Sequence, residues 1–325
     1  MTRNPENHTK PPRVTLLTPV YNEEGNLHRY EQKISEILFS RTEYDFGVLF
    51  IDDGSTDHSW EIIKEMCARD SRFRGIRLSR NYGSHLAISA GFANEDRDSD
   101  AIVIMACDLQ DPPEVVLEFI KKWESGAKIV WSQRRLHEDK GLSKFANIIF
   151  YTLMHRFAAP KGTQFNTCSF FLVDRVVAEC YRQFVEQNRI ISALVALTGF
   201  EQDVVIYSRR PRMAGVSGWT FGKKLKALYD ALLGYSFMPI RLILLLGIGV
   251  FFFSIILAIY SLYCWFTSSP LEGYTSLILA VSFFFGIQFL LMSIVGEYLY
   301  RIYTEVVRRP LYFISDRTDR SKTKI

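Results

Sequence analysis

The sequence predicts an α/β domain with a mostly parallel sheet and helices on both faces, followed by two membrane-spanning helices. Three observations lead to this prediction. Short apolar runs alternate with helix-patterned segments over residues 14–131, charged and apolar residues stay mixed to about residue 230, and two long stretches near the C-terminus carry no charge. The chain has 325 residues, which is enough for more than one folded unit.

The alternation over residues 14–131 is regular enough to place each element. Apolar runs that fit strands lie at Val14–Pro19, Phe46–Ile51, Phe73–Leu78, Ala101–Met105 and Lys128–Trp131. Segments with apolar residues at helical spacing lie between them, at Asn26–Phe39, Ser59–Arg69, Ser84–Ala93 and Pro113–Trp123. Residues 142–207 are expected to add another helix and one or two strands. Because strands joined through helices pair in parallel, we expect ligands at the carboxyl edge of this sheet.

Two uncharged stretches predict a membrane hairpin. No charged residue occurs from Leu242 to Phe266 or from Tyr274 to Gly296, and roughly 20 apolar residues suffice to cross a bilayer as a helix. The predicted spans are 238–266 and 274–298. Lys and Arg residues flank the outer ends of the hairpin and are absent from its turn, so both termini and the domain are expected on the cytoplasmic side of the inner membrane. Such a hairpin with few polar residues also suits self-association into a homo-oligomer.

The other segments complete the predicted organisation. Residues 1–13 are a polar, disordered lead-in, 14–220 form the α/β domain, 221–237 an amphipathic helix at the membrane interface, and 299–325 a cytoplasmic tail. The five cysteines form no CxxC pair, which favours a reducing compartment. A net charge of +4 gives no indication of a nucleic-acid partner.

Polar motifs follow three of the predicted strands. Tyr21-Asn22-Glu23 comes after Pro19, Asp52-Asp53-Gly54-Ser55 after the second strand, and Asp108-Leu109-Gln110 after the fourth. Carboxylates can accept hydrogen bonds from a nucleobase or a ribose, and a tyrosine offers an aromatic face. Since these motifs share one edge of the sheet, they predict a nucleotide pocket there.

Asp108 and Gln110 are the predicted metal ligands. A magnesium or manganese ion on a nucleotide diphosphate takes one or two protein oxygens, and phosphate and water complete its shell. Asp111 has a different explanation. It precedes Pro112-Pro113-Glu114, a pattern typical of a helix start, so its side chain is expected to cap that helix.

Basic residues predict a phosphate site beside this pocket. Arginine binds phosphate through two parallel hydrogen bonds. The candidates are Arg134, Arg135, Lys140, Ser143, Arg209, Arg210 and Arg212, with Ser217 in a tight loop after Gly215. Electrostatic adhesion to lipid headgroups is the alternative role for any one of these basic residues.

The order of the motifs resembles family 2 glycosyltransferases that act on polyprenyl phosphates, such as bactoprenol glucosyltransferases and dolichol-phosphate mannose synthases. Here the motifs read Pro-x-Tyr-Asn-Glu, Asp-Asp-Gly-Ser, Arg-Asn-Tyr-Gly, Asp-Leu-Gln-Asp-Pro-Pro and Arg-x-x-Gly-x-Ser. The resemblance implies a GT-A fold and inverting transfer from a nucleotide sugar to a lipid phosphate. It implies nucleotide contacts from Pro19, Tyr21, Glu23, Asp53 and Asp108, phosphate contacts from Arg134, Arg209, Arg212 and Ser217, and a catalytic set of Asp108, Arg134 and Arg212.

Two positions depart from the family pattern. Ala106 stands where many relatives have a first acid before the Asp-Leu-Gln motif, and Ser169 stands where relatives often carry an Asp. Glu201 and Asp203 are candidate substitutes for that second acid. The expected reaction is glucose transfer from UDP-glucose to undecaprenyl phosphate, with Mg²⁺ or Mn²⁺. The alternatives are a GDP-mannose-dependent polyprenyl-phosphate mannose synthase and a non-catalytic nucleotide-binding scaffold.

Overall fold

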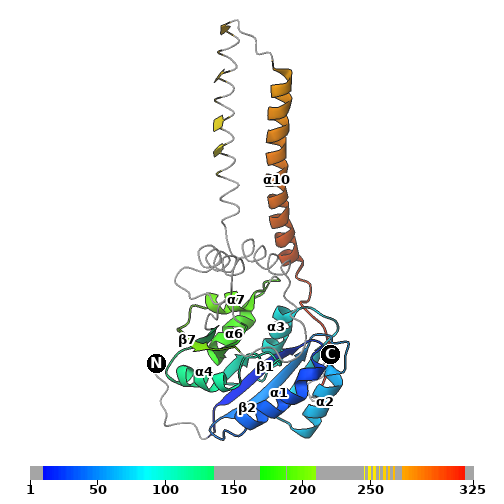
Figure 1. The fold of residues 1–325 in the computed structure, drawn as a ribbon, viewed down its shortest axis with the longest axis vertical. Coiled ribbons are helices and arrows are strands. Elements are labelled where there is room, and N and C mark those ends of the chain that lie inside the picture. Colours follow the sequence, from blue (N-terminus) through cyan, green and yellow to red (C-terminus); the bar gives the residue numbers. More distant parts are fainter. Residues whose placement is uncertain are drawn as a thin grey trace. The chain divides into compact units, whose positions relative to one another are not determined.

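The structure is a computed structural model that describes residues 10–134, 169–187 and 189–209, scattered positions between 245 and 267, and residues 273–318. The chain divides into two compact units. The first is an α/β unit that contains the described residues up to 209 and those from 310 onward. The second includes one long helix, α10 (Tyr274–Val307), which Figure 1 draws in orange.

Eight strands of the first unit form one sheet in the order β7-β5-β6-β4-β1-β2-β3-β8. The strands are β1 (Arg13–Val20), β2 (Asp45–Asp52), β3 (Phe73–Leu78), β4 (Ala101–Ile104), β5 (Ile129–Arg134), β6 (Phe171–Asp174), β7 (Gln202–Tyr207) and β8 (Ile314–Arg317). The helices are α1 (Glu24–Ile37), α2 (Ser59–Arg69), α3 (Ser84–Asn94), α4 (Glu114–Glu124), α6 (Arg175–Gln183) and α7 (Ile191–Leu197). Only β6 and β8 run antiparallel to their neighbours among these strands. The predicted α/β core with a mostly parallel sheet is therefore confirmed.

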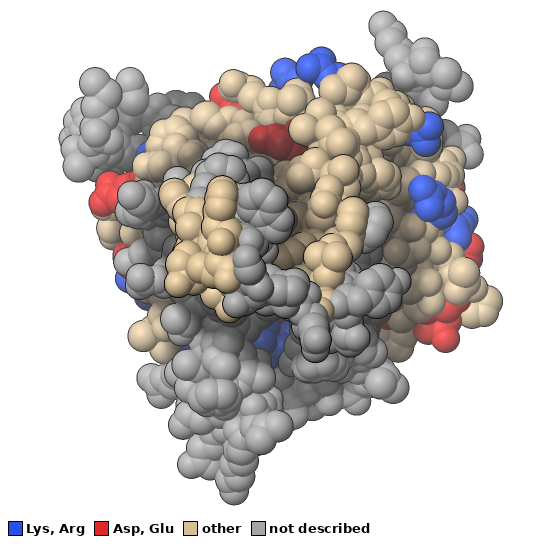
Figure 2. Space-filling model, turned by 90° about the horizontal axis from the view of Figure 1, so that it is seen from above, with Lys and Arg blue, Asp and Glu red and all other residues tan. Residues whose placement is uncertain are grey.

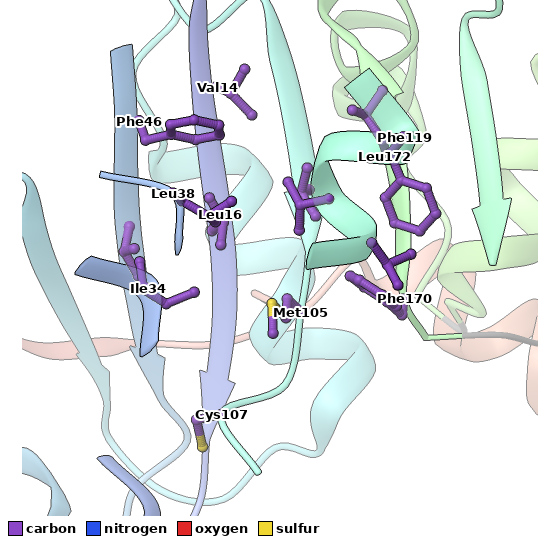
Figure 3. Packing of buried hydrophobic residues seen from close by; sticks show 14 of the residues in the cluster. Val14, Leu16, Ile34, Leu38, Phe46, Met105, Cys107, Phe119, Phe170 and Leu172 are labelled. Carbon is purple, nitrogen blue, oxygen red and sulfur yellow. The ribbon is translucent and has the colours of Figure 1, made fainter. Parts of the chain in front are cut away.

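The main hydrophobic core lies between the sheet and the helices α1, α2 and α4. Val14 and Leu16 of β1 belong to one buried cluster with Ile34 of α1, and Phe119 of α4 packs against Phe170 with ring centroids 4.8 Å apart (Figure 3). Val14 and Leu16 reach the same core because alternate residues of a strand point to the same face, and all of these side chains are buried. The opposite face receives α3, which approaches β1 and β2 closely at its glycine, Gly91.

The last strand comes from the far end of the chain. β8 follows α10 in sequence, yet it pairs with β3 and closes that edge of the sheet. The Trp60 indole N–H donates to Asp316 Oδ2 at 3.1 Å, and the backbone N–H of Gly75 donates to Thr318 Oγ1 at 2.8 Å. The predicted tail 299–325 thus contains a strand that the sequence analysis does not assign, and this strand covers an edge that would otherwise be open.

Removing β8 is expected to destabilise the α/β unit. A chain that stops after Pro310 loses the partners of Trp60 and Gly75 and the carbonyl of Phe313, to which Ser79 N–H donates at 2.9 Å. We expect the free energy of unfolding to fall by about 2 kcal/mol or more, because each unpartnered donor costs roughly 1 kcal/mol. Denaturant unfolding measures this change. A chain that stops after Asp319 keeps β8 and serves as the control; equal stability of the two truncated chains would refute the prediction.

The predicted membrane spans receive no support from the structure. Within the described ranges, no helix combines the length and apolarity needed to cross a membrane. Most of the predicted span 238–266, and all of the predicted interfacial helix 221–237, lie outside the described residues. α10 begins at Tyr274, where the second span is predicted to begin, and continues to Val307, where Arg308 adopts a left-handed conformation (φ 50°) and ends it.

On the face of the molecule that Figure 2 shows, the described charges are not segregated by sign. Figure 2 shows Lys and Arg side chains interspersed with Asp and Glu on the visible face. The net charge of +4 therefore does not correspond to one basic patch among the described residues of that face.

Candidate active site

The predicted motifs meet at the carboxyl edge of the sheet. β1, β2, β3, β4, β5 and β7 all point the same way, so the loops that follow them lie at one edge. The β1 and β2 loops are joined directly. The N–H of Asn22 donates to Ser55 Oγ at 3.0 Å, and the N–H of Thr56 donates to Asn22 Oδ1 at 2.8 Å. This places the motif around Tyr21 beside the motif around Asp53.

The β1 loop holds an unusual backbone conformation at this junction. Asn22 has φ 54°, a left-handed backbone conformation that residues other than glycine rarely adopt and that asparagine tolerates better than most. The adjacent Glu23 donates its N–H to Ser59 Oγ at 2.9 Å, and its carboxylate accepts from the amide of Asn26. Tyr21 remains 45% exposed, so its ring is open to a ligand. Pro19, at the end of β1, is half-buried.

Asp52, the last residue of β2, and Asp53, which follows it, are buried carboxylates with different partners. Asp52 Oδ1 accepts from Ser55 N–H at 3.2 Å, and Arg77 Nε lies 3.1 Å from its second oxygen. Asp53 accepts from the backbone N–H of Tyr82 at 2.7 Å and of Gly83 at 2.8 Å. Burial raises the pKa of both carboxyls, while these hydrogen bonds oppose the rise. Asp53, predicted to contact the nucleotide, therefore also anchors the Arg-Asn-Tyr-Gly loop at the start of α3.

Gly54 allows the loop after β3 to approach the Asp-Asp-Gly-Ser motif closely. Its φ is +69°, and an added Cβ would lie 2.5 Å from the carbonyl carbon of Arg80. The Arg80 guanidinium in turn lies 4.5 Å from the ring centroid of Tyr82. The Asp-Asp-Gly-Ser motif is therefore packed directly against the loop after β3, and only glycine satisfies both the backbone conformation and the space.

Asp108 and Gln110 lie in the loop after β4. Leu109 between them has φ 53°, and Gln110 donates its N–H to Asp108 Oδ1 at 3.2 Å. No group of three or more His, Cys, Asp or Glu residues suited to a metal ion occurs among the described residues. The donors present fit a Mg²⁺ or Mn²⁺ ion that takes few protein ligands and completes its shell with phosphate and water.

The helix-cap prediction for Asp111 is wrong. α4 begins at Glu114 after Pro113, and no side chain caps it. Asp111 is instead 2% exposed, accepts a hydrogen bond from the Tyr207 hydroxyl, and forms an ion pair with Arg209 at 3.3 Å. Local sequence misled the prediction because the pattern Asp-Pro-Pro-Glu describes a helix start, whereas the partners of Asp111 are about 100 residues away in β7 and beyond.

Arg134 and Tyr207 end neighbouring strands. They are register partners in the parallel pair β5 and β7, so Arg134, Tyr207 and Arg209 gather at the same edge as the acidic loops. Burial, followed by the nearby Asp111 carboxylate, raises the pKa of Tyr207 to about 12, against an opposing hydrogen bond from Arg134. The hydroxyl is therefore protonated at neutral pH and available as a donor.

Comparison with known proteins assigns the family. Residues 15–182 match the family model "Glycosyl transferase family 2". The chain belongs to this family. It is 35% identical over 306 residues to the uncharacterized glycosyltransferase YkcC of Bacillus subtilis, with 92% of both chains covered. It is 30% identical over 304 residues to the SfII prophage-derived bactoprenol glucosyl transferase of Shigella flexneri, covering 93% of this chain and 97% of that one.

A solved structure is also similar. Glucosyl-3-phosphoglycerate synthase from Mycobacterium tuberculosis, in complex with Mn²⁺, UDP-glucose and phosphoglyceric acid, aligns with a TM-score of 0.47 and 16% identity. The alignment covers 69% of this chain and 79% of that one. The family resemblance predicted from the motifs is thus confirmed by the sequence relatives, and the protein is a glycosyltransferase.

The remaining predicted site residues of this glycosyltransferase are either remote from the site, at its edge, or outside the described residues. Glu201 and Asp203 are wrong as substitute acids, because they lie at the amino end of β7 and Asp203 pairs with Lys122 at 2.7 Å. Ser169 is exposed and lies at the carboxyl edge, next to Phe170, whose carbonyl accepts from Ser132 N–H at 3.2 Å. The predicted residues Arg135, Lys140, Ser143, Arg210, Arg212 and Ser217 lie outside the described residues.

Three side chains that build this edge are not among the predicted site residues. Asn22 joins two loops, Arg77 pairs with Asp52, and Tyr207 links Asp111 to Arg134. Asn22 stands inside a motif already singled out, so its position was a usable signal. Arg77 and Tyr207 follow ordinary strand patterns, and nothing local marks either of them.

Proposed function

We propose that this protein transfers a sugar with inversion from a nucleotide sugar to a polyprenyl phosphate at the cytoplasmic face of the inner membrane. UDP-glucose is the favoured donor and undecaprenyl phosphate the favoured acceptor. The observation that carries the proposal is the meeting of acidic loops and arginines at one edge of the sheet. Tyr21, Asp53 and Asp108 lie on the loops after β1, β2 and β4, while Arg134 and Arg209 follow β5 and β7.

The choice of acceptor is supported by the relatives and by charge. Several relatives that match over more than 90% of this chain are named bactoprenol glucosyl transferases. A phosphate monoester carries nearly two negative charges at neutral pH, and guanidinium groups bind such an anion through paired hydrogen bonds. Arg134 and the partly exposed Arg209 supply this chemistry beside the nucleotide loops.

The reaction needs little proton transfer. An oxygen of the lipid phosphate attacks the anomeric carbon of the sugar, a carbon–oxygen bond forms, and the bond to the nucleoside diphosphate breaks as that diphosphate leaves with the electron pair. With a second pKa near 6, by analogy with phosphorylated side chains, the attacking phosphate is largely ionised at pH 7 and requires no strong base. Catalysis then depends on placement and on stabilisation of charge, which agrees with Ser169 at the position of an acid.

A divalent metal is part of the proposal. Asp108 and Gln110 would hold Mg²⁺ or Mn²⁺, and the ion would stabilise the charge on the departing diphosphate. The nucleoside would lie against Tyr21 and the Asp53 loop, while Glu23 and Pro19 shape the wall beside it. In this arrangement the side chains of the chain bind, orient and shield the reacting groups.

Membrane attachment through two spans remains a proposal from the uncharged stretches of the sequence. The pairing of β8 with β3 supports one aspect of it. The described residues up to 209 and residues 310–318 belong to one compact unit. If the intervening segment enters a bilayer, it must return to the side from which it left, so the number of crossings is even. This agrees with a hairpin that leaves both termini in the cytoplasm.

The reaction can be tested with the purified full chain in detergent. UDP-glucose, UDP-GlcNAc, UDP-galactose and GDP-mannose, each with a labelled sugar, are supplied separately with undecaprenyl phosphate and Mg²⁺. We expect an organic-extractable labelled lipid from UDP-glucose, loss of product when EDTA is added, and recovery with excess Mg²⁺ or Mn²⁺. Transfer from GDP-mannose alone would instead assign the mannose synthase activity. Nucleotide binding without transfer from any donor would contradict the proposal and favour the scaffold.

A further inference from the structure

We infer that Asp111 and Tyr207 form a positioning pair that holds Arg134 and Arg209 in place for the acceptor phosphate. The inference rests on the proposed function, because it assigns these arginines to the lipid phosphate. It adds two residues that neither the motifs nor the family resemblance singled out for this role. Neither residue is proposed to touch the reacting atoms.

Asp111 contacts two members of the cluster formed by Asp111, Tyr207, Arg134 and Arg209. Its carboxylate is 2% exposed and accepts from the Tyr207 hydroxyl, while Arg209 Nε lies 3.3 Å from the same oxygen. A buried carboxylate is retained only when charged or polar partners compensate for its lost hydration. Asp111 lies in the loop after β4, and both partners come from β7 and the residues that follow it. The carboxylate therefore ties two separate loops of the carboxyl edge together.

Tyr207 extends this cluster to the second arginine. It is 6% exposed, and its ring packs edge-on against Phe170 with centroids 5.8 Å apart, which restricts its rotation. Its hydroxyl donates to Asp111 and accepts from Arg134, its register partner across β5 and β7. A single hydroxyl thus connects the buried carboxylate with the guanidinium at the end of β5.

The charges explain why such a pair is useful. Two guanidinium groups at one edge repel each other, and the repulsion is strongest where water is excluded. One carboxylate between them lowers that repulsion and leaves the cluster with a net charge of about +1, still attractive to a phosphate. The side chain of Arg209 is 32% exposed, so an anion has access to it. Fixing both guanidiniums before the lipid arrives reduces the entropy that binding would otherwise cost.

The test compares Tyr207→Phe and Asp111→Asn with a matched control, Tyr181→Phe. Tyr181 is also buried and shares a hydrogen bond of 2.7 Å with Ser89, between α6 and α3. For each variant we would measure kcat, the KM for undecaprenyl phosphate, the KM for UDP-glucose, and the binding of a short-chain prenyl phosphate by calorimetry. Tyr207→Phe is expected to raise the acceptor KM about tenfold and Asp111→Asn more than that, while the donor KM changes less than twofold.

A double variant separates positioning from general stability. If Asp111 acts through the arginines, then Asp111→Asn raises the acceptor KM by a smaller factor in the Arg209→Ala background than in the unaltered protein. Additive effects, equal rises in both KM values, or a Tyr207→Phe variant that matches Tyr181→Phe would each overturn the inference. Tyr207→Phe keeps the test decisive if Asp111→Asn fails to fold. Failure of the proposed function has a different signature, since the unaltered protein would then form no labelled lipid.

Discussion

Replacing Asp108 with alanine is expected to lower kcat for sugar transfer about a thousandfold while the fold stays intact. If a metal stabilises the departing diphosphate by several kcal/mol, its loss at about 1.4 kcal/mol per factor of ten accounts for that size. Asp108 lies in a loop, where it accepts a hydrogen bond from Gln110 N–H at 3.2 Å, and it is not part of a helix or strand. Initial rates of lipid labelling measure the loss of kcat, and a thermal melt of the same preparation measures whether the fold is intact.

Asp98→Ala is the matched control for this prediction. Asp98 is a loop carboxylate whose side chain is 75% exposed, and it pairs with Arg13 at the opposite edge of the sheet. Its removal is expected to leave the rate within twofold of that of the unaltered protein, because surface ion pairs contribute little. An Asp108→Ala variant that transfers sugar as fast as the control would refute the metal assignment of Asp108 and Gln110.

The second large effect is expected at Gly54. An alanine there must adopt φ +69° and must place its Cβ 2.5–2.9 Å from backbone atoms of Arg80. The left-handed conformation costs about 1–2 kcal/mol, and the overlap forces the loop after β3 to move. We expect Gly54→Ala to reduce the free energy of unfolding by about 3 kcal/mol or more. Because Asp53 holds the same loop, the KM for the nucleotide sugar should also rise.

Two other glycines separate the causes of this effect. Gly83 has φ +93° but open space around it, so Gly83→Ala measures backbone strain without overlap. Gly25 lies in α1 with nothing within 4 Å, and Gly25→Ala is expected to be neutral or stabilising by up to about 1 kcal/mol. Denaturant unfolding of all three variants should rank Gly25 as the mildest change and Gly54 as the most severe. A Gly54→Ala variant no less stable than Gly83→Ala would contradict the close approach of Arg80.

Much of the α/β unit is predictable because its signals are local. The nine elements expected over residues 14–131 all occur, with ends within three residues of those predicted. Period-2 and period-3.6 patterns follow directly from which faces are buried, and they are strong in these segments. β8 shows the limit. Ile314-Ser-Asp-Arg has no apolar alternation, and it is a strand only because β3 offers an unpaired edge.

One part of the candidate site is predictable from local sequence signals, and the other part depends on contacts between distant segments. The alternation of elements already implies that Tyr21, Asp53 and Asp108 share one edge, since parallel strands end together. The partners of Asp111 are not implied, because the motif around it has a sufficient local explanation as a helix start. Asp53 is a similar case, since its two bonds to the loop at Tyr82 and Gly83 depend on how closely that loop packs.

By itself, the sequence determined the order of helices and strands over residues 14–131, the edge at which ligands are expected, and the family. These depend on periodicity and on short motifs, which act within a few residues. Only the tertiary structure decided that Asp111 and Tyr207 join the arginines, that Glu201 and Asp203 are remote from the site, and that residues 314–317 complete the sheet. Each of these depends on contacts between segments about 80 to 240 residues apart, and no local pattern specifies such a partner.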